Sequence, residues 1–124
     1  MEIQGKVISG AHEGQYFMSL DVYRGQFREK IGFEPFPGTL NLEINEEDVN
    51  QIQQLKGQMK SVTGQGKFGD VKVLPALLNR KVEGALVFPE KTHHRPEILE
   101  FVASQNLRKL LQLQDGDQTI LEIK

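Results

Sequence analysis

The sequence predicts one mostly β domain, a small closed barrel of about six strands with two or three short helices. Several short segments alternate between apolar and polar residues, which is the two-residue period of strands. The segments with a helical period are few and short. Strands and helices do not follow one another in regular βαβ order, which disfavours a doubly wound sheet. A length of 124 residues suits a single domain over residues 1–124.

The clearest strand signal is at residues 39–44, where the alternation is strict. Leu40, Leu42 and Ile44 are expected on the inner face, and the residues between them on the other face. Residues 79–80 and 115–117 are predicted turns. The strands are predicted at residues 3–9, 15–20, 39–44, 58–62 (the weakest), 68–78, 81–88 and 119–123.

The clearest helix signal is at residues 21–31. Tyr23, Phe27 and Ile31 are four residues apart and share one helical face, Asp21 can cap the start, and Gly32 can end the helix. A polar helix is predicted at residues 45–55. Two shorter helices are predicted at 96–102, starting at Pro96, and at 106–111.

The bulk composition excludes several classes of protein. A formal net charge of −2 argues against a generic electrostatic nucleic-acid binder. The absence of cysteine excludes a disulfide scaffold, a thiolate metal site and a cysteine nucleophile, and no HExxH pair occurs. We expect a cytoplasmic protein without membrane contact, because the start lacks the pattern of a signal peptide and no apolar stretch approaches the ~18 residues of a membrane span.

Two glycine-rich segments are candidates for phosphate binding. Residues 64–69 match GxGxxG, but a strand pattern follows them instead of a helix, so we interpret them as a hairpin loop. Residues 9–16 are a candidate anion cradle, because glycines let backbone N–H groups converge on phosphate oxygens. A plain hairpin loop fits them equally well. No P-loop or protein-kinase motif set is present, so a kinase here would follow neither common design.

Thr39 and Asn41 lie on one face of the strand predicted at 39–44. A hydroxyl and an amide carbonyl are hard oxygen donors, which Mg²⁺ prefers together with water and substrate phosphates. Two solvent-facing polar residues on an amphipathic strand are the alternative interpretation.

Residues 91–100 concentrate ionisable groups. The adjacent His93 and His94 would point to opposite faces of an extended chain, which disfavours a metal site. Glu97 and Glu100 would share one face of the helix predicted at 96–102. That face could also be merely solvated.

Taken in order, the segments resemble the archaeal CTP-dependent riboflavin kinases over nearly the whole chain. The resemblance implies a six-stranded cradle-loop barrel that transfers the γ-phosphate of CTP to the 5′-hydroxyl of riboflavin, giving FMN and CDP. The matching segments are Ser9-Gly10, Gly14, Tyr16-Phe17, Gly32-Phe33-Glu34-Pro35, Gly38-Thr39-Leu40-Asn41-Leu42, Gly69, Val71-Lys72-Val73-Leu74-Pro75, Gly84-Ala85, Pro89, Lys91-Thr92, His94, Glu97, Glu100, Leu107-Arg108 and Asp115-Gly116-Asp117.

The same resemblance implies roles for individual residues. Thr39 and Asn41 match the Mg²⁺ ligands of the family, and Thr92 and Glu100 match its flavin contacts. No general base is identified, and Glu97 is only a weak candidate. We expect a monomer with riboflavin and CTP as its partners. The implied nucleotide contacts are Gly10, Ala11, His12, Glu13, Gly14, Gln15, Tyr16, Asn106 (where the family has a lysine), Leu107 and Arg108.

Small barrels of this kind also serve as DNA-binding regulators and as ligand-binding modules without catalysis. The chain has 15 basic and 17 acidic residues and no long basic run, which disfavours a DNA-binding regulator. A non-catalytic flavin- or nucleotide-binding module stays open as the alternative, and Mg²⁺-dependent turnover would separate the two.

Overall fold

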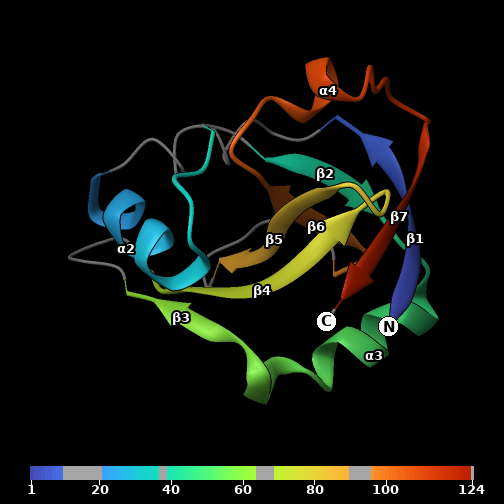
Figure 1. Cartoon of the computed structure of the whole chain (residues 1–124). Helices are drawn as coiled ribbons and strands as arrows, with labels where there is room; N and C mark the ends of the chain where they lie inside the picture. Colours follow the sequence, from blue (N-terminus) through green and yellow to red (C-terminus); the bar gives the residue numbers. More distant parts are fainter. Residues whose placement is uncertain (10–20, 37–38, 64–68, 90–95, 124) are drawn as a thin grey trace.

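A computed structural model describes residues 1–9, 21–36, 39–63, 69–89 and 96–123 (Figure 1). Within these ranges, no helix is long and apolar enough to cross a membrane. The helices are α2 (Asp21–Ile31), α3 (Glu46–Gln53) and α4 (Leu107–Leu110), with a 3₁₀ turn at Lys56–Gln58. The strands are β1 (Glu2–Ile8), β2 (Leu40–Glu43), β3 (Lys60–Val62), β4 (Val71–Leu78), β5 (Val82–Pro89), β6 (Ile98–Val102) and β7 (Gln118–Ile123).

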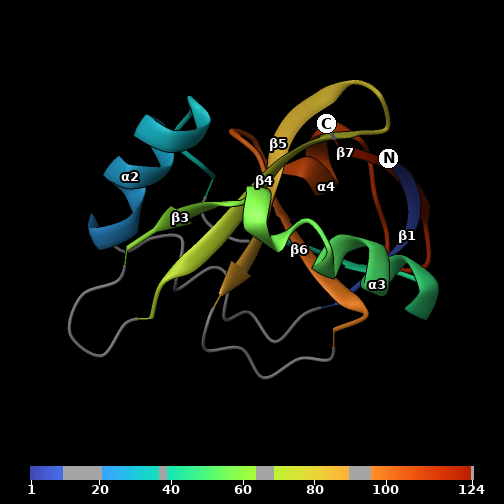
Figure 2. The ribbon, with the colours of Figure 1, turned by 90° about the horizontal axis from the view of Figure 1, so that it is seen from below.

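Six strands form a closed antiparallel barrel. The sheet runs β4-β5-β6-β2-β1-β7, and β7 pairs back with β4, so every strand of the ring has two neighbours. The short β3 stands outside the ring and, within the part of the chain that the structure describes, pairs only with β4. The two chain ends lie side by side (Figures 1 and 2), and the Met1 amino group donates to the Ile123 carbonyl at 3.0 Å. The predicted six-stranded barrel is confirmed.

The barrel interior holds the larger of two hydrophobic clusters. Leu40, Leu42 and Ile44 are buried in it, as the alternation of residues 39–44 predicts. α3 and α4 contribute to the same cluster and lie on opposite sides of the barrel (Figure 1). They therefore help to close its ends, because their apolar side chains are buried against the strands' interior residues.

α2 covers part of the outer surface of the barrel (Figure 2). Its Phe27, which is 0% exposed, packs among outward-facing residues of β3, β4, β5 and β6 in the second hydrophobic cluster. The helix ends as predicted: Gly32 adopts a φ of +86°, and its N–H donates to the Arg28 carbonyl at 3.1 Å. This part of the sheet is consequently buried on both faces.

The short helix predicted at 96–102 is wrong: residues 98–102 form strand β6. Burial on both faces explains the error. Leu99 and Phe101 face the barrel interior, while Val102 packs in the cluster under α2. Apolar residues at consecutive positions hide the two-residue period of a strand, and a short run of this kind cannot be told from a helix by periodicity. The strand predicted at 15–20 lies outside the described residues.

Candidate active site

The register between β2 and β6 brings three predicted site residues together on the outer surface of the barrel. Asn41 is the direct cross-strand partner of Glu100. Thr39 lies two residues before Asn41, and its hydroxyl donates to the Glu100 carboxylate at 3.0 Å. The adjacent interior positions, Leu40 and Leu42, hold this stretch of β2 in place through the barrel core.

Glu100 is 4% exposed, although it is a carboxylate on an outward-facing position. A buried carboxylate is costly unless it is hydrogen-bonded, and the Thr39 hydroxyl supplies one such bond. Hydroxyl, amide and carboxylate oxygens thus gather within one small area. This donor set suits a hard cation such as Mg²⁺.

The described residues contain no cluster of three or more histidine, aspartate and glutamate side chains that could hold a metal. The described residues of this region therefore do not form a cage of carboxylates like that of many calcium sites. Its donors are two neutral oxygens next to one carboxylate. A cation here would depend on phosphate oxygens and water for its remaining ligands.

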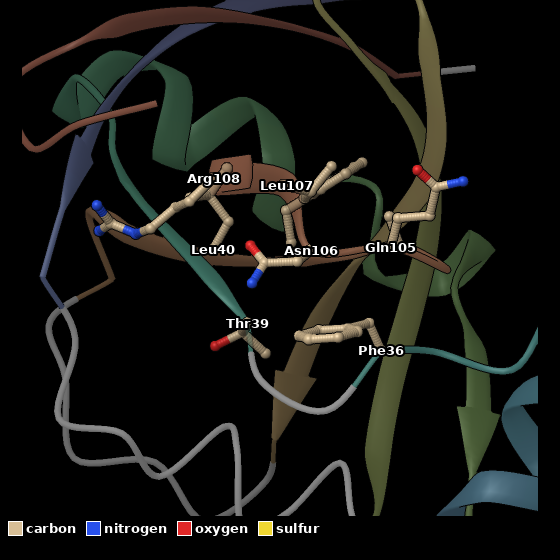
Figure 3. Close-up of a pocket in the computed structure, with 9 residues that line it drawn as sticks. Phe36, Thr39, Leu40, Gln105, Asn106, Leu107 and Arg108 are labelled. Carbon is tan, nitrogen blue, oxygen red and sulfur yellow. The ribbon is translucent and has the colours of Figure 1, made fainter. Parts of the chain in front are cut away.

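A pocket of about 100 Å³ begins at Thr39 and reaches the start of α4 (Figure 3). Phe36, Thr39 and Asn106 surround one opening in this view, and the Arg108 side chain extends away from Phe36 toward the end of β1. The side-chain Oδ1 of Asn106 accepts the Lys109 N–H at 3.2 Å and caps α4. The predicted metal ligand Thr39 and the predicted nucleotide contacts 106–108 therefore border the same pocket.

The guanidinium of Arg108 is held away from Phe36 (Figure 3). It donates to Asp115 at 2.7 Å and to the Ile8 carbonyl at 3.3 Å. The second oxygen of Asp115 accepts a short hydrogen bond from the Ser9 hydroxyl. The hydrogen bond from Ser9, followed by that from Arg108, holds the pKa of Asp115 below its ordinary value of 3.8.

Glu97 lies apart from this cluster. It borders a second pocket, of about 340 Å³, together with Lys6 and Glu43. Glu97 and Glu100 do not share a helix face, because residues 98–102 are a strand and Glu97 lies in the turn that precedes it. The structure brings Glu100, and not Glu97, to Thr39 and Asn41.

The predicted nucleotide contacts at 10–16 and the predicted flavin contact Thr92 lie outside the described residues. Phe36 and Gln105 border the pocket and Asp115 holds its Arg108, although the sequence analysis did not single them out as site residues. Phe36 is 43% exposed, unusual for a phenylalanine, and lies between two prolines. No local pattern could reveal Asp115, because its partner Ser9 is 106 residues away.

Comparisons with known proteins identify the family of the chain. The family model labelled CTP-dependent riboflavin kinase, and described as a domain of unknown function (DUF120), matches residues 7–123. The riboflavin kinase of Methanothermobacter thermautotrophicus is 53% identical over 115 residues, covering 93% of each chain. That of Methanobrevibacter smithii is 43% identical, covering 98% of this chain and 99% of its own.

A third relative, the riboflavin kinase of Ignicoccus hospitalis, is 46% identical over 95% of this chain and 68% of its own. The family match spans nearly the whole barrel, including β2, β6 and α4. The chain therefore belongs to the CTP-dependent riboflavin kinase family and is a kinase.

Proposed function

We propose that this protein transfers the γ-phosphate of CTP to the 5′-hydroxyl of riboflavin in an Mg²⁺-dependent reaction that yields FMN and CDP. One observation carries the proposal. Thr39, which is bonded to Glu100 and lies beside Asn41, borders the same pocket as Asn106 and Arg108, in a chain of this family. The names of the relatives support riboflavin as the acceptor, and the family label supports CTP as the donor.

Thr39 and Asn41 are the residues that would hold Mg²⁺. Their oxygens fit the ion, and the hydroxyl proton of Thr39 is directed to Glu100, so its lone pairs stay available for a cation. Mg²⁺ bound there would offset the negative charge of the terminal phosphates. The side chain of Asn41 is half-buried and anchored on a strand whose inward residues are fully packed, which fixes its position before substrate arrives.

Nucleotide binding is assigned to two chain segments. We propose that backbone amides of residues 10–16 hold the phosphate chain, and that Asn106, Leu107 and Arg108 form the second contact. Arg108, which borders the pocket, would contribute positive charge to this site. Phosphoryl transfer asks chiefly for alignment and charge neutralisation, so these positioning contacts would account for most of the catalysis.

Glu100 is the carboxylate that we propose to receive the proton of the riboflavin hydroxyl. It is buried at the site and hydrogen-bonded to Thr39, whereas Glu97 borders another pocket. A carboxylate accepts several hydrogen bonds, so the bond to Thr39 leaves capacity for a substrate hydroxyl. As the new O–P bond forms, the bond between the γ-phosphorus and its bridging oxygen breaks, and CDP leaves. Thr92 would orient the flavin together with Glu100.

The test is a direct assay. The protein is mixed with riboflavin and Mg²⁺ and with either CTP or ATP, and FMN is followed by chromatography. We expect FMN and CDP in equal amounts with CTP, and none after Mg²⁺ is chelated. If FMN formed with ATP but not with CTP, the protein would still be a riboflavin kinase, but CTP would not be its phosphate donor. Binding of riboflavin or CTP without FMN would favour a non-catalytic binding module.

A further inference from the structure

Ser9, Arg108 and Asp115 form a connected group at the end of β1. They come from three segments: Ser9 follows β1, Arg108 belongs to α4, and Asp115 lies in the turn before β7. One oxygen of Asp115 accepts the Arg108 guanidinium at 2.7 Å, and the other accepts the Ser9 hydroxyl. Arg108 also donates to the Ile8 carbonyl at 3.3 Å, which closes the group.

Both partners of Asp115 are connected to the proposed nucleotide site. Arg108 borders the pocket and is a proposed nucleotide contact. Ser9 immediately precedes residues 10–16, which are the other proposed contact. A single carboxylate therefore joins the two parts of the chain that are assigned to the nucleotide. The contacts of Asp115 are observed in the structure. Their role in nucleotide binding rests on the proposed function.

The turn that carries Asp115 is held by other bonds. The Gly116 N–H donates to the Val7 carbonyl at 2.7 Å, and the Val7 N–H donates to the Asp117 carbonyl at 2.8 Å. The Asp117 carboxylate accepts the Gln114 N–H at 2.9 Å. The backbone of the turn is thus fixed without the Asp115 side chain.

The group contributes little to stability, because its members are exposed. The side chains of Arg108 and Asp115 are 42% and 53% exposed, and solvent screens ion pairs of this kind. Its effect should instead be on the orientation of Arg108. A guanidinium has five N–H donors in a rigid fork, so bonds from one nitrogen to Asp115 and Ile8 set the direction of the others.

We propose that Asp115 is a positioning residue for the nucleotide, which acts by holding Arg108 and Ser9 in the arrangement that receives the phosphate chain. Figure 3 shows the Arg108 side chain already extended toward the end of β1, where this arrangement lies. Because the arrangement is formed before the nucleotide binds, less ordering is needed on binding. Loss of Asp115 should therefore weaken CTP binding.

The test is Asp115→Asn, which keeps the size of the side chain and removes its charge. We expect the KM for CTP to rise about five- to tenfold, as for the loss of one charge-assisted contact. The kcat and the KM for riboflavin should stay within about twofold, and the Tm should fall by less than about 5 °C. The matched control is Glu2→Gln, which removes the exposed Arg80–Glu2 ion pair at the other end of β1 and should leave all constants unchanged.

A double mutant shows whether Asp115 acts through Arg108. Arg108→Gln alone should raise the KM for CTP, and adding Asp115→Asn should raise it no further. Additive effects would overturn the inference. So would an unchanged KM in Asp115→Asn, or a lowered KM, which would mean that Asp115 competes with the nucleotide for Arg108. In each of these cases the wild type still makes FMN from CTP. A wild type that neither turns over nor binds CTP, as measured by calorimetry, would overturn the proposed function as well.

Discussion

Asn41 and Glu100 face each other across β2 and β6, and each has a testable role. The two residues are 59 positions apart in the sequence, and their proximity depends on strand register alone. A one-residue shift of either strand would turn its own side chain to the other face of the sheet and separate the pair. The packed interior residues Leu40, Leu42 and Phe101 prevent that shift.

Asn41→Ala should remove the kinase activity and leave the fold intact. The amide is a proposed Mg²⁺ ligand and faces away from the core, so its loss should cost about 100-fold or more in kcat with little change in Tm. The Mg²⁺ concentration for half-maximal rate should also rise. Gln4→Ala, an outward-facing amide on β1 beside the second pocket, is the control and should be fully active. Undiminished turnover by Asn41→Ala would refute the metal assignment.

Glu100→Gln and Glu97→Gln separate the two candidate bases. Glutamine at 100 can still accept the Thr39 hydrogen bond but cannot receive a proton, so kcat should fall about 10²- to 10⁴-fold. Glu97→Gln should remain within about twofold of wild type, because that residue borders another pocket. Single-turnover FMN formation measures both effects. If Glu97→Gln lowered kcat more than Glu100→Gln, Glu97 would be the proton acceptor instead.

At the scale of elements, β5 and β6 approach each other closely at Gly84. A Cβ atom at this position would lie 2.2 Å from the Val102 carbonyl oxygen and 2.4 Å from the Phe101 ring. Only glycine permits this approach. The close contact fixes the position of β6, and therefore of Glu100 on its outer face.

Gly84→Ala should destabilise the protein by about 1–3 kcal/mol, because β6 must move to make room. Gly25→Ala is the opposite case: Gly25 lies within α2 with no atom near its Cβ position, so alanine should stabilise by about 0.5–1 kcal/mol. Urea unfolding gives both values. We also expect Gly84→Ala to lower kcat through the displacement of Glu100. Equal stabilities for the two variants would contradict the packing argument.

At the scale of the whole molecule, closure of the ring explains why no barrel strand offers a free edge. The β4–β7 pairing joins the middle of the chain to its end, and among the described strands the short β3 is the one outside the ring. α2 partly protects that strand: the Gln26 amide exchanges two hydrogen bonds with the backbone of Thr63, at 2.7 and 2.8 Å.

We expect the protein to be a monomer. The large apolar side chains that are exposed in the described part of the chain, Met1, Phe36 and Leu110, belong to three separate segments. A stable dimer interface needs a larger continuous surface. Light scattering after gel filtration should give a mass near 14.1 kDa. A mass of twice that value at micromolar concentration would contradict this expectation.

The sequence by itself determined the elements whose local pattern is unambiguous. Strict alternation identified β2 and its two faces, and a four-residue spacing followed by Gly32 identified α2. The turn at Asn79 and Arg80 was also predicted, and both residues adopt the positive φ of a tight hairpin. These features depend on the side-chain period of strands and helices and on the allowed backbone conformations. Both can be inferred from residues that are close together in the sequence.

Only the tertiary structure decided what depends on contacts between distant residues. β6 was mistaken for a helix because its outward-facing Val102 is buried in the cluster under α2, and its sequence carries no sign of that cover. The site itself was predicted through family resemblance, as separate residues. Strand pairing and ring closure bring Thr39 to Glu100 and Asp115 to Ser9. They also place Glu97 at a different pocket. These pairings are set by the packing energy of the whole chain, which no local pattern contains.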